Sequence, residues 1–164
     1  MAYRLSVKKY DQLMGWVLKT LTRWHKRVVR ISRGKLGKKF PGGAPVVWLT
    51  IPGRRSGLPR TVPLLGAEES DGSWVVAGSA GGSSTPPLWA LNAIYASEQA
   101  LTDCWLELDK QKFRVRVIQL TDENERVAAY EKLISKWKFF RSYAKRAGRV
   151  IPVFRLKIES NTNL

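Results

Sequence analysis

The sequence predicts an α+β fold built on a mostly antiparallel β-barrel, with helices packed around it. Its apolar runs are short, and residues typical of turns separate them, as expected for strands. Three of the connections are too short to hold a crossover helix, which makes hairpins the expected link. Strands and helices also do not alternate regularly, which disfavours a doubly wound parallel sheet. A length of 164 residues suits one such domain rather than two.

The first 43 residues are expected to form an appendage to a barrel domain of residues 44–164. Residues 1–40 hold twelve Lys or Arg against one acid, a net charge of +11 out of +16 for the whole chain. Between positions 10 and 31 apolar residues recur every three or four positions, and most cations lie on other faces, which predicts a basic amphipathic helix. The glycines and proline of residues 34–43 predict a linker.

Two roles are open for this helix. It can pack its apolar stripe on the barrel, or residues 10–33 can lie on an anionic membrane surface. No apolar run approaches the roughly 18 residues of a membrane span, and the N-terminus lacks the apolar core and cleavage site of a secretory signal. The expected location is therefore the cytoplasm, with peripheral attachment to the inner face of the cell membrane as a second expectation.

The barrel domain is expected to begin with three strands, at residues 44–51, 60–66 and 74–79. The first two are close enough in sequence to pair as a hairpin. A loop of small residues follows, and Pro87 at its end suits the first position of a helix over LWALNAIYASEQA.

The rest of the domain is expected to add two strands, two helices and a last strand. The two strands cover residues 101–109 and 112–120, and the second alternates apolar residues with arginines. Thr121, followed by acidic residues, indicates a helix whose N-terminus the Thr121 hydroxyl caps. A second helical piece at 138–148 ends in glycine, and the last strand covers 150–158.

Side chains that usually carry catalysis are scarce. His25, the one histidine, lies in the basic helix, and Cys104, the one cysteine, lies inside an expected strand. A disulfide within the chain or a zinc, haem or iron–sulfur site is therefore not expected. A nucleophile would also lack a neighbouring base, so an enzyme of this sequence is expected to use a cofactor for the difficult step.

Two segments have the composition of binding sites. IPGRRSGLPRTVP holds Arg54, Arg55 and Arg60 beside glycines that let a ligand approach the backbone, and guanidinium groups bind phosphate or carboxylate. A solvated hairpin tip is the alternative interpretation. GSAGGSSTPPLW offers unobstructed amides near a helix N-terminus, which suits an anion, and a flexible loop is its alternative.

Together, TIPGRRSGLPRTVPL and VVAGSAGGSSTPPLWALN resemble the deazaflavin-dependent nitroreductase family. That family has a T-x-G-R-x-S-G-x-P-R turn, an A-S-K-G-G loop and a P-x-W-x-x-N helix start. The similarity extends from Gly34 to the end of the chain, through the R-x-I-P-V motif at residues 149–153. The resemblance implies a split β-barrel of the FMN-binding type. It also implies coenzyme F420, a hydride carrier with a phosphodiester and a polyglutamate tail.

The resemblance further implies which residues hold the cofactor. Arginines of the turn would meet its anionic parts, small residues of the loop would approach the phosphate and ring, and the helix start would close over it. In that order these residues are Arg54, Arg55, Ser56 and Arg60; Ser79, Ala80, Gly81 and Gly82; and Pro87, Trp89 and Asn92. At Ala80 the family usually has lysine, so this chain lacks that cation, and three outcomes are open: neighbouring arginines compensate, F420 binds weakly, or the barrel holds another ligand.

The implied reaction is hydride transfer from reduced deazaflavin to an electron-poor quinone, enone or nitro compound. Family members place tyrosines of the C-terminal helix over the substrate, and the matching residues here are Phe140 and Tyr143. Tyr143 is the expected substrate contact and proton donor, with a packing role as the alternative. A lipophilic small molecule is the expected substrate, and a monomer or homodimer is the expected assembly.

Other functions stay open at this level. Related split barrels bind FMN or lipids, so an FMN-type or non-catalytic carrier is the first alternative. A sequence pI of ≈ 10.4 and the basic strand KFRVRV are also typical of nucleic-acid binding. Nucleic acid is nevertheless not the expected partner, because no recognised nucleic-acid motif occurs.

Overall fold

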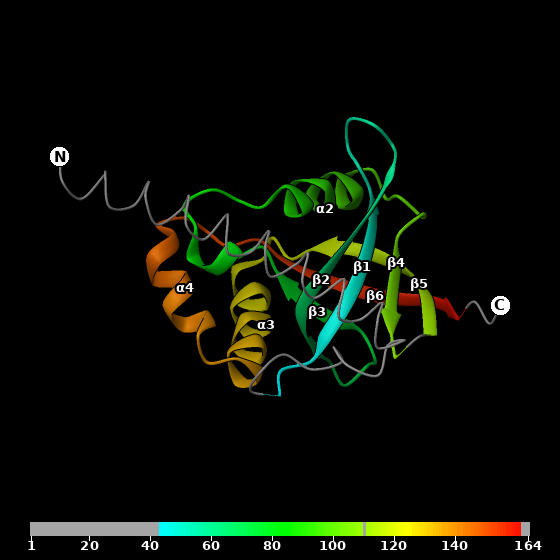
Figure 1. Cartoon of the computed structure of the whole chain (residues 1–164). Helices are drawn as coiled ribbons and strands as arrows, with labels where there is room; N and C mark the ends of the chain where they lie inside the picture. The colour runs from blue at the N-terminus through cyan, green and yellow to red at the C-terminus, as the bar shows by residue number, and fades with distance from the viewer. Residues whose placement is uncertain (1–42, 110, 162–164) are drawn as a thin grey trace, which may run out of the picture.

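The computed structural model describes residues 43–109 and 111–161, in which six strands close into an antiparallel barrel (Figure 1). Around the barrel the strand order is β1-β2-β3-β6-β5-β4, and β4 pairs with β1. The strands are β1 Val46–Pro52, β2 Pro59–Glu68, β3 Trp74–Ala77, β4 Trp105–Leu108, β5 Gln111–Gln119 and β6 Val153–Asn161. The expected antiparallel barrel is confirmed, whereas the helix expected at residues 10–31 lies outside the described residues.

β1 and β2 form the hairpin that the sequence predicts. Their pairing begins with Val46 opposite Leu65 and continues to the hairpin tip. Every second residue of β1 is buried in the barrel, namely Val47, Leu49 and Ile51. This period of two fixes the register, because a shift by one residue would turn the apolar side chains outward.

The last strand, β6, lies between β3 and β5 and completes the barrel. It pairs with β3 along Trp74–Ala77 and with β5 along most of its length. β5 presents Val115 and Val117 to the core and Arg114 and Arg116 to solvent, as its alternation predicts. No local pattern indicates the pairing of β6 with β3, because these strands are far apart in sequence.

Helices cover the barrel on two sides (Figure 1). Their bounds are α2 Leu88–Glu98, α3 Glu123–Lys136 and α4 Phe140–Ala147, and a short 3-10 turn, η1, covers Ala80–Gly82. α2 lies against β1 and β5 and buries three alanines, Ala90, Ala93 and Ala96, whose small side chains allow a close approach. α3 packs on β2 and β3, and α4 packs on η1. None of the helices in the described residues is long and apolar enough to cross a membrane.

Two helix boundaries differ from expectation. Asp122, not Thr121, caps α3, because its Oδ1 accepts a hydrogen bond from the amide of Glu125 at 2.9 Å. A carboxylate is the stronger acceptor and also complements the helix dipole. Pro87 occupies the N-cap position of α2, one residue before the first helical residue, Leu88.

The strand expected from residue 101 begins only at Trp105, because the preceding residues close α2. The amide of Leu101 donates to the carbonyl of Ala96 at 2.9 Å, and that of Ala100 donates to Ser97 at 3.2 Å. Ala100 has a φ of 47°. These are the two hydrogen bonds and the left-handed residue of a Schellman motif.

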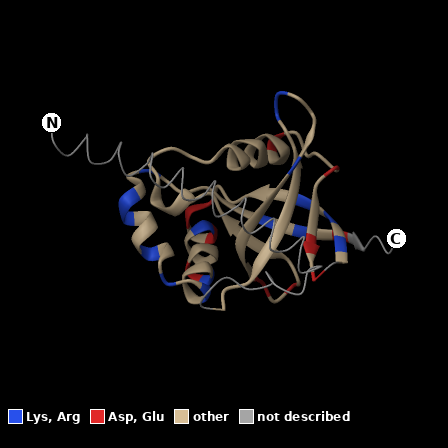
Figure 2. Cartoon of the chain, in the orientation of Figure 1, with Lys and Arg blue, Asp and Glu red and all other residues tan. Residues whose placement is uncertain are grey.

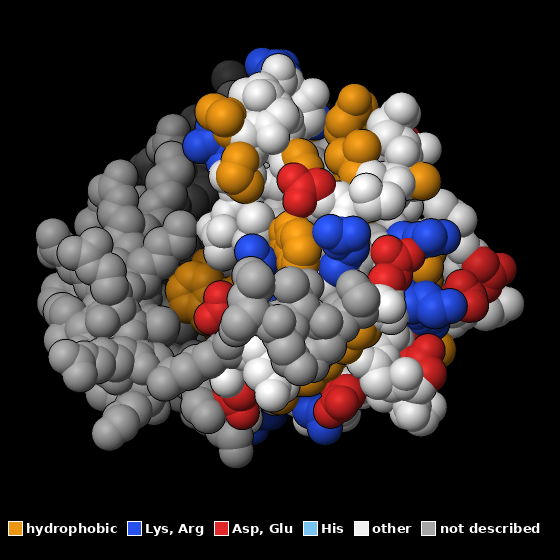
Figure 3. All heavy atoms as spheres, turned by 90° about the vertical axis from the view of Figure 1, so that its right-hand side faces the viewer, with side chains coloured by type: hydrophobic (Ala, Val, Ile, Leu, Met, Phe, Trp, Pro, Cys, Tyr) orange, Lys and Arg blue, Asp and Glu red, His pale blue; other side chains and the backbone are white. Residues whose placement is uncertain are grey.

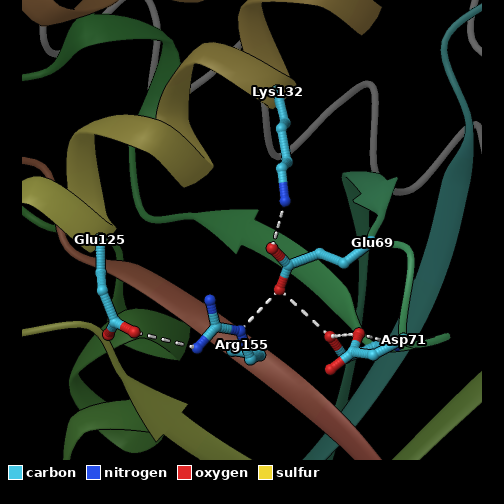
Figure 4. Close-up of polar contacts among 6 residues, drawn as sticks. Glu69, Asp71, Glu125, Lys132 and Arg155 are labelled. Carbon is cyan, nitrogen blue, oxygen red and sulfur yellow. Dashed lines mark hydrogen bonds and ion pairs between the residues drawn. The ribbon is translucent and has the colours of Figure 1, made fainter.

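A charge network joins the β2–β3 turn to α3 and β6 (Figure 4). The carboxylate of Glu69, whose side chain is 8% exposed, accepts hydrogen bonds from Lys132 Nζ and Arg155 Nε, both at 2.6 Å. Ser73 Oγ donates to it at 3.1 Å. Burial alone would raise the pKa of Glu69, but the hydrogen bonds from Arg155, Lys132 and Ser73 together lower it below its ordinary value. The network therefore joins three elements that are far apart in the sequence.

Candidate active site

The arginine turn, residues 53–60, comprises the tip of the β1–β2 hairpin and the first two residues of β2, Pro59 and Arg60. Its own backbone closes it: the amide of Gly53 donates to Leu58 at 2.9 Å, and that of Gly57 donates to Gly53 at 2.7 Å. Ser56 belongs to this scaffold, since its Oγ accepts a hydrogen bond from the amide of Leu58 at 3.4 Å. Because the backbone holds the turn, its cationic side chains are not needed to stabilise it.

The three arginines of the turn are exposed. In the part of the chain that the structure describes, Arg54, Arg55 and Arg60 form no ion pair. In Figure 3 the hairpin forms the top of the molecule and carries basic side chains. Exposed guanidinium groups that form no ion pair can bind a phosphate or carboxylate.

An open pocket of about 330 Å³ lies between the turn and the C-terminal end of α2. The turn lines it with Pro52, Gly53, Arg54, Arg55 and Gly57, and the other side is lined by Tyr95, Leu101, Thr102 and Asp103. Asp103 is the one acid among these lining residues, and its Oδ1 already accepts a hydrogen bond from the indole Nε1 of Trp105 at 2.7 Å. The pocket therefore favours an anionic ligand.

α2 connects the arginine turn to the glycine loop, residues 78–85. The amide of Arg54 donates to Asn92 Oδ1 at 3.3 Å, which attaches the turn to the helix. The loop enters the same helix through Pro87, and the ring of Trp89 packs on Phe154 at 5.7 Å between centroids. The arginine turn and the glycine loop, which are separate in the sequence, are thus both attached to α2.

The glycine loop has an unusual backbone that α4 helps to determine. Ala80, Gly81 and Gly82 have φ values of 46°, 65° and 85°. A Cβ on Gly82 would lie 3.0 Å from the Cα of Tyr143 and 3.1 Å from its carbonyl oxygen. Gly82 is therefore required for close packing against α4, in addition to any role toward a ligand.

Ser79 carries an unpaired polar group into this loop. Its side chain is 7% exposed, and within residues 43–109 and 111–161 neither its hydroxyl nor its amide has a hydrogen-bond partner. A buried hydroxyl left in this way costs about 1–3 kcal/mol, so such groups usually meet a ligand or water. A hydroxyl and backbone amides without partners can donate hydrogen bonds to an anion or to a carbonyl oxygen of a ligand.

Tyr143 lies on α4, directly against the loop. Its Oη accepts a hydrogen bond from Trp137 Nε1 at 3.3 Å, which leaves its own proton available to another acceptor. Phe140 is only 4% exposed, and its ring makes edge contacts with Tyr130 and Tyr143. The structure therefore gives Phe140 a packing position beneath Tyr143.

Arg149 is a site residue to which the sequence assigns no role. Its side chain binds carbonyl groups of the glycine loop, including that of Gly78 at 2.9 Å and that of Ser83 at 3.1 Å. In the sequence Arg149 is marked by its place in the R-x-I-P-V motif, but the motif does not indicate which groups its side chain binds.

Comparison with known proteins identifies the family. A family model described as F420H(2)-dependent quinone reductase matches residues 21–157. The F420H(2)-dependent quinone reductase of Mycobacterium tuberculosis is 27% identical over 135 residues, which cover 81% of this chain and 87% of that protein. The barrel is also similar to that of an F420-H2 dependent reductase, with a TM-score of 0.59, 26% identity and coverage of 69% of this chain and 94% of the other.

A further solved structure, described as a domain-swapped dimer, has a TM-score of 0.61 and 23% identity and covers 87% of this chain and 98% of the other, which supports the fold. The expected deazaflavin-dependent reductase class and the expected cofactor, F420, agree with the family description. On the family model and the closed antiparallel barrel together, the chain belongs to the F420H(2)-dependent quinone reductase family.

Proposed function

We propose that the protein binds reduced F420 along α2 and reduces a quinone or a similar electron-poor, lipophilic compound. One observation carries this proposal: the cationic pocket and the unpaired Ser79 hydroxyl lie at two segments that α2 connects. A long cofactor with an anionic tail and a polar ring system needs two such contact regions. When bound, reduced F420 supplies a hydride.

The residues have distinct roles in this proposal. Arg54, Arg55 and Arg60 bind anionic groups of the cofactor, and Ser56 keeps the turn closed. Ser79, Ala80, Gly81 and Gly82 face its phosphate or ring through backbone groups and the Ser79 hydroxyl. Pro87, Trp89 and Asn92 place α2 and attach the turn to it. These assignments fit the donors that the structure leaves exposed or unpaired.

Tyr143 is the proposed substrate contact, and Phe140 supports its ring. Reduction of a quinone to a quinol needs a proton for each hydride, and Tyr143 Oη can donate one because its hydrogen has no acceptor in the described part of the chain. α4 and the loop would also orient the substrate and exclude water from it.

The test is a titration of the full-length protein with F420, followed by Trp fluorescence. We expect saturable binding that weakens about tenfold when Arg54 and Arg55 are both replaced by Gln, because charge-assisted hydrogen bonds are lost. Replacing Lys145 and Lys157 by Gln removes the same charge from exposed positions outside the arginine turn and should leave the affinity unchanged.

Titration with FMN completes the test. No binding of F420 would contradict the proposal. Tighter binding of FMN than of F420 would also contradict it and would favour an FMN-type split barrel instead.

We also propose that residues 10–33 attach the protein to an anionic membrane surface. The support is the sequence pattern: an apolar stripe opposed by cations, in a segment that lies outside the described residues. A lipophilic substrate dissolved in the bilayer would give such attachment a purpose.

A further inference from the structure

The guanidinium group of Arg149 lies behind the glycine loop and binds carbonyls from both of its ends. Its Nη2 donates to Gly78 at 2.9 Å and to Thr85 at 3.5 Å, and its Nε donates to Ser83 at 3.1 Å. Arg149 itself follows α4 and precedes β6, so it is distant from the loop in sequence. One side chain therefore binds carbonyl groups along the loop from Gly78 to Thr85.

Because each carbonyl belongs to a peptide group, holding the carbonyls in place also fixes the direction of the neighbouring amides of the loop. Ser79 is in the right-handed helical region, with φ −75° and ψ −32°, and Ala80 follows with a positive φ of 46°. Right-handed and left-handed residues in succession turn neighbouring N–H groups toward one concave side and form an anion-binding nest. In the described part of the chain neither the Ser79 amide nor the Ala80 amide donates a hydrogen bond.

We propose that Arg149 is a positioning residue for the cofactor. It holds residues 78–85 so that the amides of Ser79 and Ala80 and the Ser79 hydroxyl face an oxyanion of F420. It also places a positive charge behind those peptides. This inference rests on the proposed function, and it accounts for a site that carries no cation at position 80 itself.

The first test compares three single variants of the full-length protein. Arg149→Gln should weaken F420 binding about tenfold, because the charge and the carbonyl contacts are lost together. Arg149→Lys keeps the charge but cannot reach several carbonyls at once, so it should give an intermediate affinity. Arg141→Gln, an exposed change on α4, is the matched control and should bind F420 as the unmodified protein does.

Hydrogen exchange without cofactor gives an independent measurement. The amides of residues 79–83 should exchange faster in Arg149→Gln than in the unmodified protein and in Arg141→Gln. Should Arg149→Gln not fold, Arg149→Lys decides the matter: exchange and affinity equal to those of the unmodified protein would overturn the inference.

Ala80→Lys separates the charge of Arg149 from its structural role. A lysine at position 80 places a cation on the ligand side of the loop. It should strengthen F420 binding by a larger factor in the Arg149→Gln background than in the unmodified protein, while loop exchange stays fast. Equal factors in the two backgrounds would overturn the charge role.

The outcomes remain distinct from those for the proposed function. If the unmodified protein does not bind F420, the proposed function is wrong. If it binds F420 and Arg149→Gln binds equally well, the proposed function stands and Arg149 is not a positioning residue.

Discussion

At the scale of single residues, Gly82 is the point where the loop and α4 meet most closely. Gly82→Ala should lower the free energy of unfolding by about 2–4 kcal/mol. An alanine is strained at a φ of 85°, and its Cβ would also lie too close to the backbone of Tyr143. Gly72→Ala is the control, since Gly72 has a φ of 80° with nothing within 4 Å. That change should cost only about 1–2 kcal/mol in urea unfolding. Equal costs would show that the contact with α4 has no energetic weight.

Tyr143 tests the proposed proton transfer. Tyr143→Phe removes the Oη proton but keeps the ring that packs on Phe140. We expect kcat for quinone reduction to fall about a hundredfold, with an unchanged Kd for F420. Stopped-flow oxidation of bound reduced F420 in the presence of a quinone measures the step.

Tyr130→Phe is the matched control for Tyr143. Tyr130 Oη donates to the carbonyl of Phe140 at 2.8 Å, and burial raises the pKa of Tyr130 to about 12, so this hydroxyl has a structural hydrogen bond. Its loss should reduce stability and leave kcat nearly unchanged. A Tyr143→Phe variant with normal kcat would return Tyr143 to a packing role.

At the scale of elements, Glu69 joins the β2–β3 turn to α3 and β6 (Figure 4). Its folded-state pKa is lowered, so its stabilising effect is present above the unfolded value of 4.5 and is lost as the pH falls through the folded value. Glu69→Gln should therefore cost about 1.5–3 kcal/mol of unfolding free energy at neutral pH, and the difference from the unmodified protein should shrink below pH 4.5. Thermal unfolding as a function of pH measures both.

The control for Glu69 is another carboxylate with a cationic neighbour. Glu123 is 83% exposed and lies 3.7 Å from Arg126. Glu123→Gln should change stability by less than about 0.5 kcal/mol, because solvent screens an exposed pair. If Glu69→Gln were equally mild at neutral pH, the network would have no role in fastening the three elements.

At the scale of the whole molecule, the charge is unevenly distributed. The barrel domain mixes both signs, although α4 carries basic residues and no acidic one (Figure 2). Residues 1–40 contribute +11 of the net +16. An excess of this size in one segment is more than a protein needs to stay in solution.

Membrane attachment can be tested with vesicles and charge variants of the full chain. The variant replaces four cations of the N-terminal segment by Gln, namely Lys19, Arg23, Lys26 and Arg27. Each cation near an anionic surface contributes about 1 kcal/mol, so binding to phosphatidylglycerol vesicles should fall at least a hundredfold, by a rough count. Sedimentation measures the bound fraction, and phosphatidylcholine vesicles should bind neither form well.

The control removes four cations from the barrel domain, namely Arg114, Arg141, Lys145 and Lys157. This variant should sediment with anionic vesicles nearly as the unmodified protein does. An equal loss in both variants would mean that total charge, not residues 10–33, attracts the protein to the membrane.

Much of the fold could be predicted because its signals are local. Alternation in β1 and β5 marks one buried face, and the short turn between β1 and β2 predicts their hairpin. The shortage of catalytic side chains predicts a cofactor, and the resemblance of the arginine turn and the glycine loop to a deazaflavin-dependent family implies an anionic one. The sequence by itself thus determined the order of the strands and helices and the antiparallel class of fold, whereas the cofactor was implied by the family resemblance.

The tertiary structure decided what depends on contacts between distant positions. β6 inserts beside β3, Arg149 binds the loop at Gly78, and Phe140 turns into the core while Ser79 is left unpaired. None of these follows from periodicity or turn chemistry, because each depends on residues that are distant in sequence and meet only in the folded protein. In the folded protein, segments far apart in the chain form one hydrogen bond or one packing contact. A local sequence pattern does not indicate which distant segments will meet.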